Sequence, residues 1–173
     1  MYLVSIYFDE KSNQRIRHLM KQVAEMTGNS FMINGNVPPH ITVGAFETKN
    51  EEEVSKCLEQ VINSWKQGKL QLVSIGTFQT SSIFLSAVYN EYLHEMCKSI
   101  YKELKTVDNT LIRGTYQPFS WVPHVTIGKT LSKEQQLKAF EVLQELFSAM
   151  EVTAIRVGLA KTNPYRDLET WDL

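Results

Sequence analysis

One six-residue pattern occurs twice in this chain and limits its fold more than any other feature. The first copy is Pro39-His40-Ile41-Thr42-Val43-Gly44, and the second, 84 residues later, is Pro123-His124-Val125-Thr126-Ile127-Gly128. In a β-strand, residues i and i+2 point to the same face, so each copy presents its His and Thr together and its apolar residues on the other face. The sequence therefore predicts two strands that each carry an imidazole beside a hydroxyl.

The elements around these strands also repeat, which indicates a duplicated unit. In the first half, periodicity predicts these elements around the first His strand: a strand over 2–8, a helix over 12–28, a helix over 50–67 and a strand over 70–78. In the second half, the same reasoning predicts, around the second His strand: a strand over 83–88, a helix over 90–104, a helix over 132–147, a strand over 152–160 and an edge strand over 168–173. We expect one domain over residues 1–173, with pseudo-symmetric halves of about 1–80 and 81–173.

Helix starts and apolar stripes give finer expectations. The predicted N-terminal caps are Ser12, the pair Asn50 and Glu53, and the pair Ser132 and Gln135. The apolar stripe predicted for the last helix consists of Leu137, Phe140, Leu143, Leu146 and Phe147. Cys57 and Cys97 lie on apolar helix stripes without a CxxC spacing, so we expect both to be reduced core residues.

Alternation of strands and helices in each half predicts an α+β fold. We expect a bilobal molecule in which two antiparallel-type sheets line a central cleft, with the helices outside. If a pseudo-twofold axis relates the halves, the two His-Thr pairs face each other across that cleft.

Composition excludes several classes of protein. The chain is 43% hydrophobic and 21% charged, as in an ordinary globular protein. Its 18 basic and 19 acidic residues nearly cancel, so it lacks the positive field of a protein that coats nucleic acid. The apolar run at 2–8 is too short for a signal peptide or a membrane span. We expect a cytoplasmic monomer with no membrane partner.

The repeated frame favours a functional role for His40 and His124, although a single His on a strand is more often structural. His18 and His94 lack the frame, and we expect them on solvated helix faces. Neither run contains HxH, HExxH or a nearby carboxylate, so no metal site is expected. The chain also has no GxSxG elbow and no GxxxxGK[ST] phosphate loop, which argues against a serine hydrolase and against ATP use.

Two such pairs can cleave or form a phosphodiester without a metal ion. One neutral imidazole takes a proton from the nucleophile, and the other, protonated, gives a proton to the leaving oxygen. An unperturbed His pKa of about 6.5 suits both roles near neutral pH. The Thr hydroxyls can donate to the non-bridging phosphate oxygens as charge develops on them.

The runs His40-Ile41-Thr42-Val43 and His124-Val125-Thr126-Ile127 resemble the duplicated H-x-T-x signature of the two-histidine phosphoesterase superfamily, which includes the bacterial 2′,5′ RNA ligase-like proteins. The resemblance covers the whole chain in size and element order. It implies catalysis by His40, Thr42, His124 and Thr126, without a cofactor, on 2′,3′-cyclic or 2′,5′-linked phosphodiesters of RNA ends or small nucleotides. It leaves open which His is the acid, and whether the chain hydrolyses or ligates.

Residues outside the motifs could bind the rest of the substrate. Aromatic candidates for stacking on an unpaired base are Phe84, Tyr116, Phe119 and Trp121. Lys129 and Arg166 could neutralise a second phosphate. The alternatives are core packing for the aromatic residues and solvation for the two cations. For the chain as a whole, the alternatives are a non-catalytic module that binds RNA ends or nucleotides, and an interaction protein in which the pairs are relics.

Overall fold

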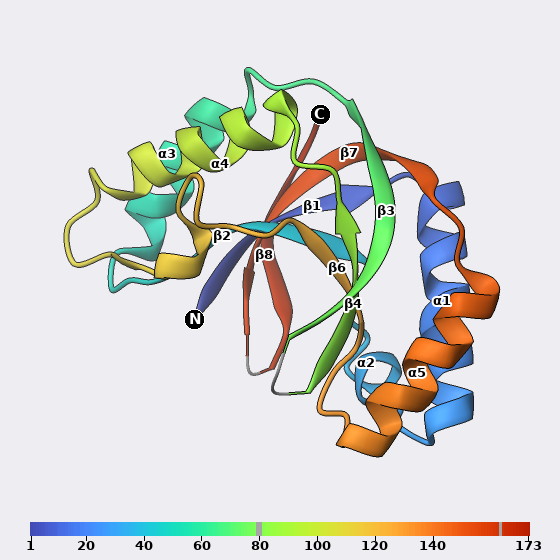
Figure 1. Ribbon diagram of the computed structural model, residues 1–173. Helices are drawn as coiled ribbons and strands as arrows, with labels where there is room; N and C mark the ends of the chain where they lie inside the picture. Colours follow the sequence, from blue (N-terminus) through green and yellow to red (C-terminus); the bar gives the residue numbers. More distant parts are fainter. Residues whose placement is uncertain (79–80, 163) are drawn as a thin grey trace.

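Antiparallel strands and two pairs of helices make up the fold (Figure 1). The computed structural model describes residues 1–78, 81–162 and 164–173. Its strands are β1 (Tyr2–Phe8), β2 (His40–Glu47), β3 (Gly68–Phe78), β4 (Ser82–Ala87), β5 (Leu111–Ile112), β6 (His124–Gly128), β7 (Met150–Lys161) and β8 (Arg166–Asp172). Its helices are α1 (Glu10–Thr27), α2 (Phe31–Asn34), α3 (Glu51–Ile62), α4 (Glu91–Leu104) and α5 (Lys133–Leu146), with a 3-10 turn η1 (Gly114–Tyr116). Every predicted strand and helix is present, and the α+β class is confirmed.

The strands form one hydrogen-bonded sheet, whereas the sequence analysis predicted two. Their order is β5-β2-β1-β7-β3-β4-β6, with β8 also on β7, and every pair is antiparallel. The prediction of two sheets was wrong because β7 joins both groups of strands. This 12-residue strand spans about 40 Å, and along one edge it pairs first with β3, over 150–154, and then with β8, over 156–161. The bilobal shape and the central cleft stay predictions.

Strand pairing repeats between the halves and also crosses between them. β1 pairs with β2 on one side and β7 on the other, and β4 pairs in the same way with β6 and β3. The first strand of each half therefore bonds to the His strand of its own half and to the strand that follows the second long helix of the other half.

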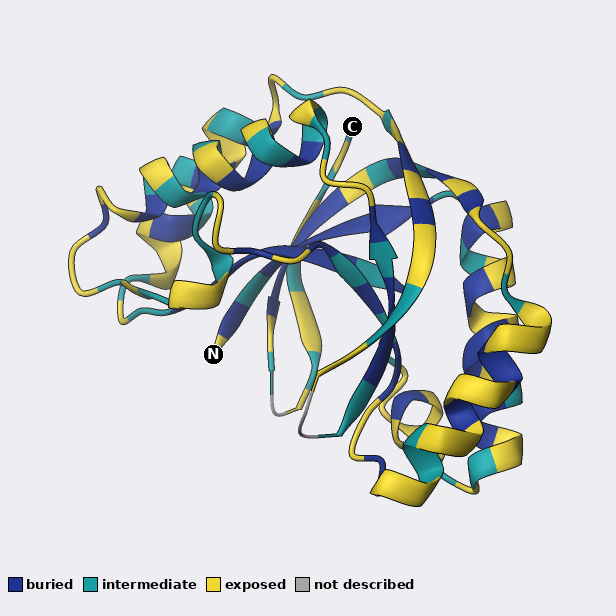
Figure 2. Ribbon diagram, in the orientation of Figure 1, coloured by how far each residue is buried: buried dark blue, intermediate teal, exposed yellow. Residues whose placement is uncertain are grey.

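Each pair of packed helices also combines one helix from each half. α1 packs on α5 and against β6, while α3 packs on α4, which lies against β2. Figure 1 shows the two helix pairs on opposite sides of the strands, and Figure 2 shows buried and exposed residues alternating around each helix. Because each pair takes one helix from each half, neither half encloses its apolar surface alone.

One predicted helix cap is a different residue in the structure, and another lacks its side-chain hydrogen bond. α1 is capped by Asp9, not Ser12: the Asp9 carboxylate accepts from the Ser12 N–H at 3.0 Å and from the Ser12 hydroxyl at 2.6 Å. Asn50 is the N-cap residue of α3, as predicted, but its side chain makes no cap hydrogen bond, and its amide nitrogen donates to the Asp108 carbonyl at 2.8 Å. The predicted capping box of Ser132 and Gln135 is confirmed.

The buried face of α5 is not the predicted stripe. Its buried residues are Ala139, Val142 and Leu143, whereas Leu137 is 61% exposed. The small Ala139 side chain, fully buried, allows close packing, and the Gln135 amide donates to the Thr27 carbonyl at the end of α1 at 3.1 Å. Of the cysteines, both free, Cys97 is buried as predicted and Cys57 is half-buried.

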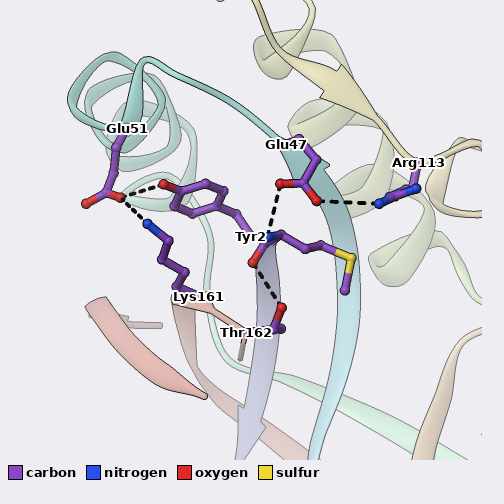
Figure 3. A network of polar contacts seen from close by, with 7 residues as sticks. Tyr2, Glu47, Glu51, Arg113, Lys161 and Thr162 are labelled. Atoms are coloured by element: carbon purple, nitrogen blue, oxygen red, sulfur yellow. Dashed lines mark hydrogen bonds and ion pairs between the residues drawn. The ribbon is translucent and has the colours of Figure 1, made fainter. Parts of the chain in front are cut away.

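A polar network holds the start of β1 (Figure 3). The amino group of Met1 lies 3.0 Å from Glu47, which also contacts Arg113 at 3.4 Å, and the Tyr2 hydroxyl donates to Glu51 at 2.7 Å. This network joins β1 to the far end of β2. The first motif lies at the opposite end of the β1 and β2 pair.

Candidate active site

Strands β2 and β6 carry the two motifs and lie close together, although four strands separate them in the sheet order. Residues of the two strands approach within 8 Å between Cα atoms (Figure 1). His40 and His124 are the first residues of these strands. The tertiary structure thus brings together two motifs that are 84 residues apart in the sequence.

A β-bulge occurs at the same place in both motifs. The register of β2 against β1 shifts so that Val43 has no direct partner, and the register of β6 against β4 shifts in the same way at Ile127. Each extra residue lies between the motif Thr and the motif Gly. Bulges bend a strand and re-aim its side chains, and they are common beside active sites.

The glycine that ends each motif lies close to side chains that pack over its strand. A Cβ added at Gly44 would lie 2.8 Å from Ile100 on α4, and a Cβ at Gly128 would lie 3.0 Å from Leu131 and 3.5 Å from Val23 on α1. α4 belongs to the second half and α1 to the first, so each motif strand packs under a helix from the other half. At Gly44 the contact with α4 explains the glycine, whereas at Gly128 the closest side chain, Leu131, lies in the loop after β6.

Each motif histidine is held by a backbone carbonyl two residues earlier. The Nδ1 of His40 lies 2.7 Å from the Pro38 oxygen, and the Nδ1 of His124 lies 2.8 Å from the Val122 oxygen. A carbonyl only accepts hydrogen bonds, so both Nδ1 atoms carry a hydrogen. Nε2 is then the nitrogen of each ring that gains or loses a proton.

Burial lowers the pKa of both histidines below the ordinary value of 6.5, and the carbonyl bonds offset part of this effect. At His40 the positive charge of His124 lowers the pKa further, so the two rings lie within electrostatic reach of each other. A lowered pKa favours the neutral, proton-accepting form at neutral pH. A phosphate between the rings would favour protonation of one of them.

The motif threonines differ in exposure. Thr42 is buried, with its hydroxyl 3.4 Å from the Ser5 hydroxyl on β1, whereas Thr126 is half-buried. Ser5 lies directly opposite Thr42, and Phe84 lies directly opposite Thr126. The same motif position therefore has a polar neighbour in one half and an apolar neighbour in the other.

His40 lies beside a carboxylate and two phenols that the sequence analysis did not identify. Its ring centroid is 6.3 Å from that of Tyr7, which lies directly opposite on β1, and 6.2 Å from that of Tyr165. The Tyr7 hydroxyl donates to Asp167 at 2.5 Å, and the Tyr165 hydroxyl donates to the same oxygen at 3.3 Å. Burial and the nearby carboxylate raise the pKa of Tyr7, which keeps its phenol protonated.

His124 lies against two phenylalanine rings. The ring centroids of Phe78 and Phe84 are 4.9 and 5.0 Å from its own, and 4.3 Å from each other. Phe84 is buried over Gly76, where a Cβ would lie 2.4 Å from the ring. Of the aromatic residues singled out in the sequence, Phe84 therefore lies beside a motif histidine. The Phe78 ring covers part of the Phe84 ring.

A family model described as the 2′-5′ RNA ligase superfamily matches residues 8–166, which include both motifs. The chain belongs to this superfamily. A comparison with curated protein sequences finds no match.

Several solved structures share the fold of this chain. Escherichia coli LigT complexed with 3′-AMP aligns with a TM-score of 0.65 and 13% identity, over 99% of this chain and 97% of LigT. TT0787 of Thermus thermophilus aligns with a TM-score of 0.63 and 17% identity, over the same 99% and 97% of the two chains. A structure described as a phosphoesterase aligns with a TM-score of 0.64 and 12% identity, over the same 99% and 97% of the two chains.

The other three aromatic candidates, Tyr116, Phe119 and Trp121, contact α4 or the loop before it. The Tyr116 carbonyl accepts from the Cys97 thiol at 3.9 Å, and the buried Trp121 ring lies 5.8 Å from Tyr89. Phe119 is 83% exposed, with its ring 4.6 Å from His94. No described aromatic contact joins these three residues to His40 or His124.

The two histidines outside the motifs, His18 and His94, differ from each other. His18 is exposed on α1, as predicted. His94 is half-buried, and its Nδ1 lies 2.7 Å from the Tyr89 hydroxyl. The prediction of a solvated face at His94 was wrong because the segment before β6 returns over the start of α4.

The two candidate cations also differ. Lys129 is exposed directly after β6, and its charge lowers the pKa of His40, so it lies within electrostatic reach of that ring. Arg166 begins β8 opposite Lys161, and its charge acts on the pKa of Lys161. Lys129 is thus the candidate cation that the structure relates to a motif histidine.

Residues 1–78, 81–162 and 164–173 contain no group of three or more His, Cys, Asp or Glu side chains placed to bind a metal ion. None of their helices has the length and apolar character needed to span a bilayer.

Proposed function

We propose that this chain is a metal-independent phosphoesterase that opens a 2′,3′-cyclic phosphate or cleaves a 2′,5′-linked ribose phosphodiester. The substrate is an RNA end or a small nucleotide, and His40 and His124 are the acid-base pair. Membership of the 2′-5′ RNA ligase superfamily supports this reaction class. Ligation would follow the same path in reverse.

The observation that carries the proposal is the duplicated presentation of the two imidazoles. Both rings donate through Nδ1 to a carbonyl two residues earlier, at 2.7 and 2.8 Å, and both keep Nε2 for proton transfer. Each ring is accompanied two residues later by a threonine hydroxyl. A structural role for one His would not require this arrangement to occur twice on two strands that approach each other.

For a cyclic phosphate, water attacks phosphorus while the neutral histidine takes a water proton through Nε2. The bond from phosphorus to one ribose oxygen breaks, and the protonated histidine gives its Nε2 proton to that oxygen. The product is a phosphomonoester, and the two histidines have exchanged protonation states, which solvent then restores. Thr42 and Thr126 donate hydrogen bonds to the non-bridging oxygens.

The ligands bound in similar structures support a nucleotide substrate. E. coli LigT has been solved in complexes with 3′-AMP, NADP+ and ATP, at TM-scores to this chain of 0.65, 0.60 and 0.55. All three ligands contain ribose and phosphate. We therefore choose ribonucleotides as the first substrates to test.

The deciding experiment measures hydrolysis of 2′,3′-cyclic mononucleotides and of oligoribonucleotides ending in a cyclic phosphate, with EDTA present. His40→Ala and His124→Ala should each reduce turnover by roughly 100- to 10,000-fold, because each removes one proton-transfer group. Identification of the released 2′- or 3′-phosphate gives the regiochemistry.

His18→Ala is the matched control, because His18 is exposed on α1 outside both motifs, and it should retain wild-type turnover. A double variant, His40→Ala with His124→Ala, that remained active would refute the mechanism. If the wild-type protein bound these nucleotides more tightly at lower pH without turning any of them over, the chain would be a binding module instead.

A further inference from the structure

A carboxylate is held beside one of the two motif histidines. The His40 ring lies 6.3 Å from the Tyr7 ring and 6.2 Å from the Tyr165 ring, measured between centroids. The hydroxyls of both tyrosines donate to Asp167 Oδ1, at 2.5 Å from Tyr7 and 3.3 Å from Tyr165. A carboxylate is ionised at neutral pH, so this group adds one negative charge to the His40 side of the candidate site.

The fold fixes this carboxylate through Tyr7. Tyr7 lies directly opposite His40 in the pairing of β1 with β2, and directly opposite residues of antiparallel strands point to the same face. Its side chain is 7% exposed and covers Gly158 on β7, where an added Cβ would lie 2.5 Å from the ring. Burial raises the pKa of Tyr7, so the phenol stays protonated and donates to Asp167.

The equivalent place beside His124 carries no charge among the described residues. The residue directly opposite His124 is Ser86, and the aromatic neighbours of the His124 ring are Phe78 and Phe84. The candidate site is therefore polarised, with a negative charge beside His40 and uncharged side chains beside His124.

Cationic groups in the site must be weighed against Asp167. Burial lowers the pKa of His40, the charges of His124 and Lys129 lower it further, and the Asp167 carboxylate raises it. Lys129 and any protonated imidazole attract every anion that enters the site. Asp167 acts in the opposite direction, because it repels an anion in proportion to the charge of that anion.

Two arginines near Asp167 do not neutralise it. Arg156 on β7 pairs with Asp172 at 3.0 Å. Arg166 precedes Asp167 on β8, and neighbouring residues of a strand point to opposite faces. In the described part of the chain, neither arginine forms an ion pair with Asp167.

The charge of a phosphate group changes when a phosphodiester is hydrolysed. A cyclic phosphate, like any phosphodiester, carries one negative charge. A phosphomonoester carries nearly two at neutral pH, because its second pKa is about 6. Ring opening by water breaks one bond from phosphorus to a ribose oxygen, and the resulting monoester then loses a proton to solvent. A fixed carboxylate repels this dianion about twice as strongly as it repels the monoanion.

We propose that Asp167 is a specificity-determining residue that favours monoanionic phosphodiesters over dianionic phosphomonoesters between the two motif histidines. The inference rests on the proposed phosphoesterase function and deepens it, because it defines the class of phosphate that the site holds. The substrate binds as a monoanion, and the product leaves as a dianion that the carboxylate repels. Tyr7 and Tyr165 act through Asp167 and are positioning residues.

This group lies outside the part of the chain that the family model matches. The superfamily model covers residues 8–166, and Tyr7 and Asp167 lie immediately beyond its two ends. The inference therefore comes from contacts of this chain.

The test compares two ligands that differ by one charge: 2′-deoxyadenosine 3′-phosphate, a dianion, and its methyl ester, a monoanion. Both lack the 2′-hydroxyl, so neither can form a cyclic phosphate. Binding of each to the full-length protein is measured by titration calorimetry at about pH 8, where the monoester is fully dianionic. Both motif histidines are neutral in the free protein at this pH, because burial lowers the pKa of each below 6.5.

Asp167→Asn removes the charge and keeps the size of the side chain. For charges about 8 Å apart, it should strengthen binding of the methyl ester by roughly 2- to 5-fold. Binding of the phosphomonoester should improve by the square of that factor, roughly 4- to 25-fold, because its charge is doubled. The ratio of the two dissociation constants is the readout, and it should shift by roughly 2- to 5-fold in favour of the monoester.

Glu169→Gln is the matched control, because it removes the same charge from an exposed residue of the same strand, whose carboxylate accepts from the Ser55 hydroxyl on α3. It should leave the ratio unchanged. An Asp167→Asn ratio equal to that of the wild type, or one that shifts no further than the Glu169→Gln ratio, would overturn the inference. If the wild-type protein binds neither ligand, no phosphate site lies beside Asp167 and the inference also fails.

A kinetic readout separates this inference from the proposed function. On a cyclic phosphate that the wild type hydrolyses, the phosphomonoester product should inhibit Asp167→Asn at a several-fold lower concentration than it inhibits the wild type, while KM for the cyclic phosphate changes less. An unchanged product inhibition constant would reject the role of Asp167 and leave the hydrolysis itself in place. If no phosphodiester is hydrolysed, the proposed function fails, while the binding ratio still decides whether Asp167 selects between the two charge states.

Discussion

At the scale of the residue, the motif glycines show how closely the halves pack. Gly44→Ala would place a Cβ 2.8 Å from Ile100, a core residue that is 1% exposed and cannot move aside. Overpacking of this kind costs about 1–3 kcal/mol. We expect the free energy of unfolding in urea to fall by that amount.

Gly114→Ala provides the comparison, because the nearest atom to a Cβ there is 4.0 Å away, on Gln117. This variant should stay within about 0.5 kcal/mol of wild type. Equal stability losses in the two variants would show that the contact with α4 is not what requires a glycine at 44.

At the scale of the element, Asp9 links α1 to the sheet. Its carboxylate caps the helix through Ser12 and also accepts from the Thr153 N–H on β7 at 3.1 Å. Burial alone would raise the pKa of Asp9, but these hydrogen bonds lower it below 3.8. A carboxyl group whose pKa is lower in the folded state stabilises the protein above its unfolded pKa, and this stabilisation is lost as the pH falls through the folded value.

Asp9→Ala should therefore reduce the free energy of unfolding by about 1 kcal/mol at pH 7. The difference from wild type should shrink as the pH is lowered below 3.8, where the wild-type carboxyl also becomes protonated. Denaturant unfolding at pH 7 and at about pH 2.5 measures both values. Asp108→Ala, at an exposed aspartate, should show neither effect, and a pH-independent loss at Asp9 would contradict the capping role.

At the scale of the whole molecule, the halves depend on each other. The first half supplies α1, which lies against β6, and the second half supplies α4, which lies against β2. Fragments 1–80 and 81–173 should each lack a cooperative thermal transition by circular dichroism, because each exposes the apolar surface that the other covers. The full chain should unfold in a single transition. A fragment that melts cooperatively by itself would show that the halves are independent units.

Local patterns in the sequence were sufficient to predict much of this protein. Periodicity and turn residues located every predicted strand and helix, because these signals depend on neighbours within a few positions. Errors occurred where a nearby residue competed for the same role, as Asp9 did with Ser12, and where a small residue such as Ala139 decided which helix face was buried. The repeated His-Thr frame gave the candidate active site and the family resemblance.

Only the tertiary structure decided how the strands are joined and what surrounds each motif histidine. β7 connects strands that periodicity treats as two sheets, because pairing partners are chosen by packing over the whole chain. Tyr7 and Asp167 are 160 positions apart, and no short-range pattern relates them. The sequence by itself determined the two imidazoles and their hydroxyl partners. The fold placed a carboxylate beside one ring and phenyl rings beside the other, because β1 and β8 both pair with β7, while β3 and β6 both pair with β4.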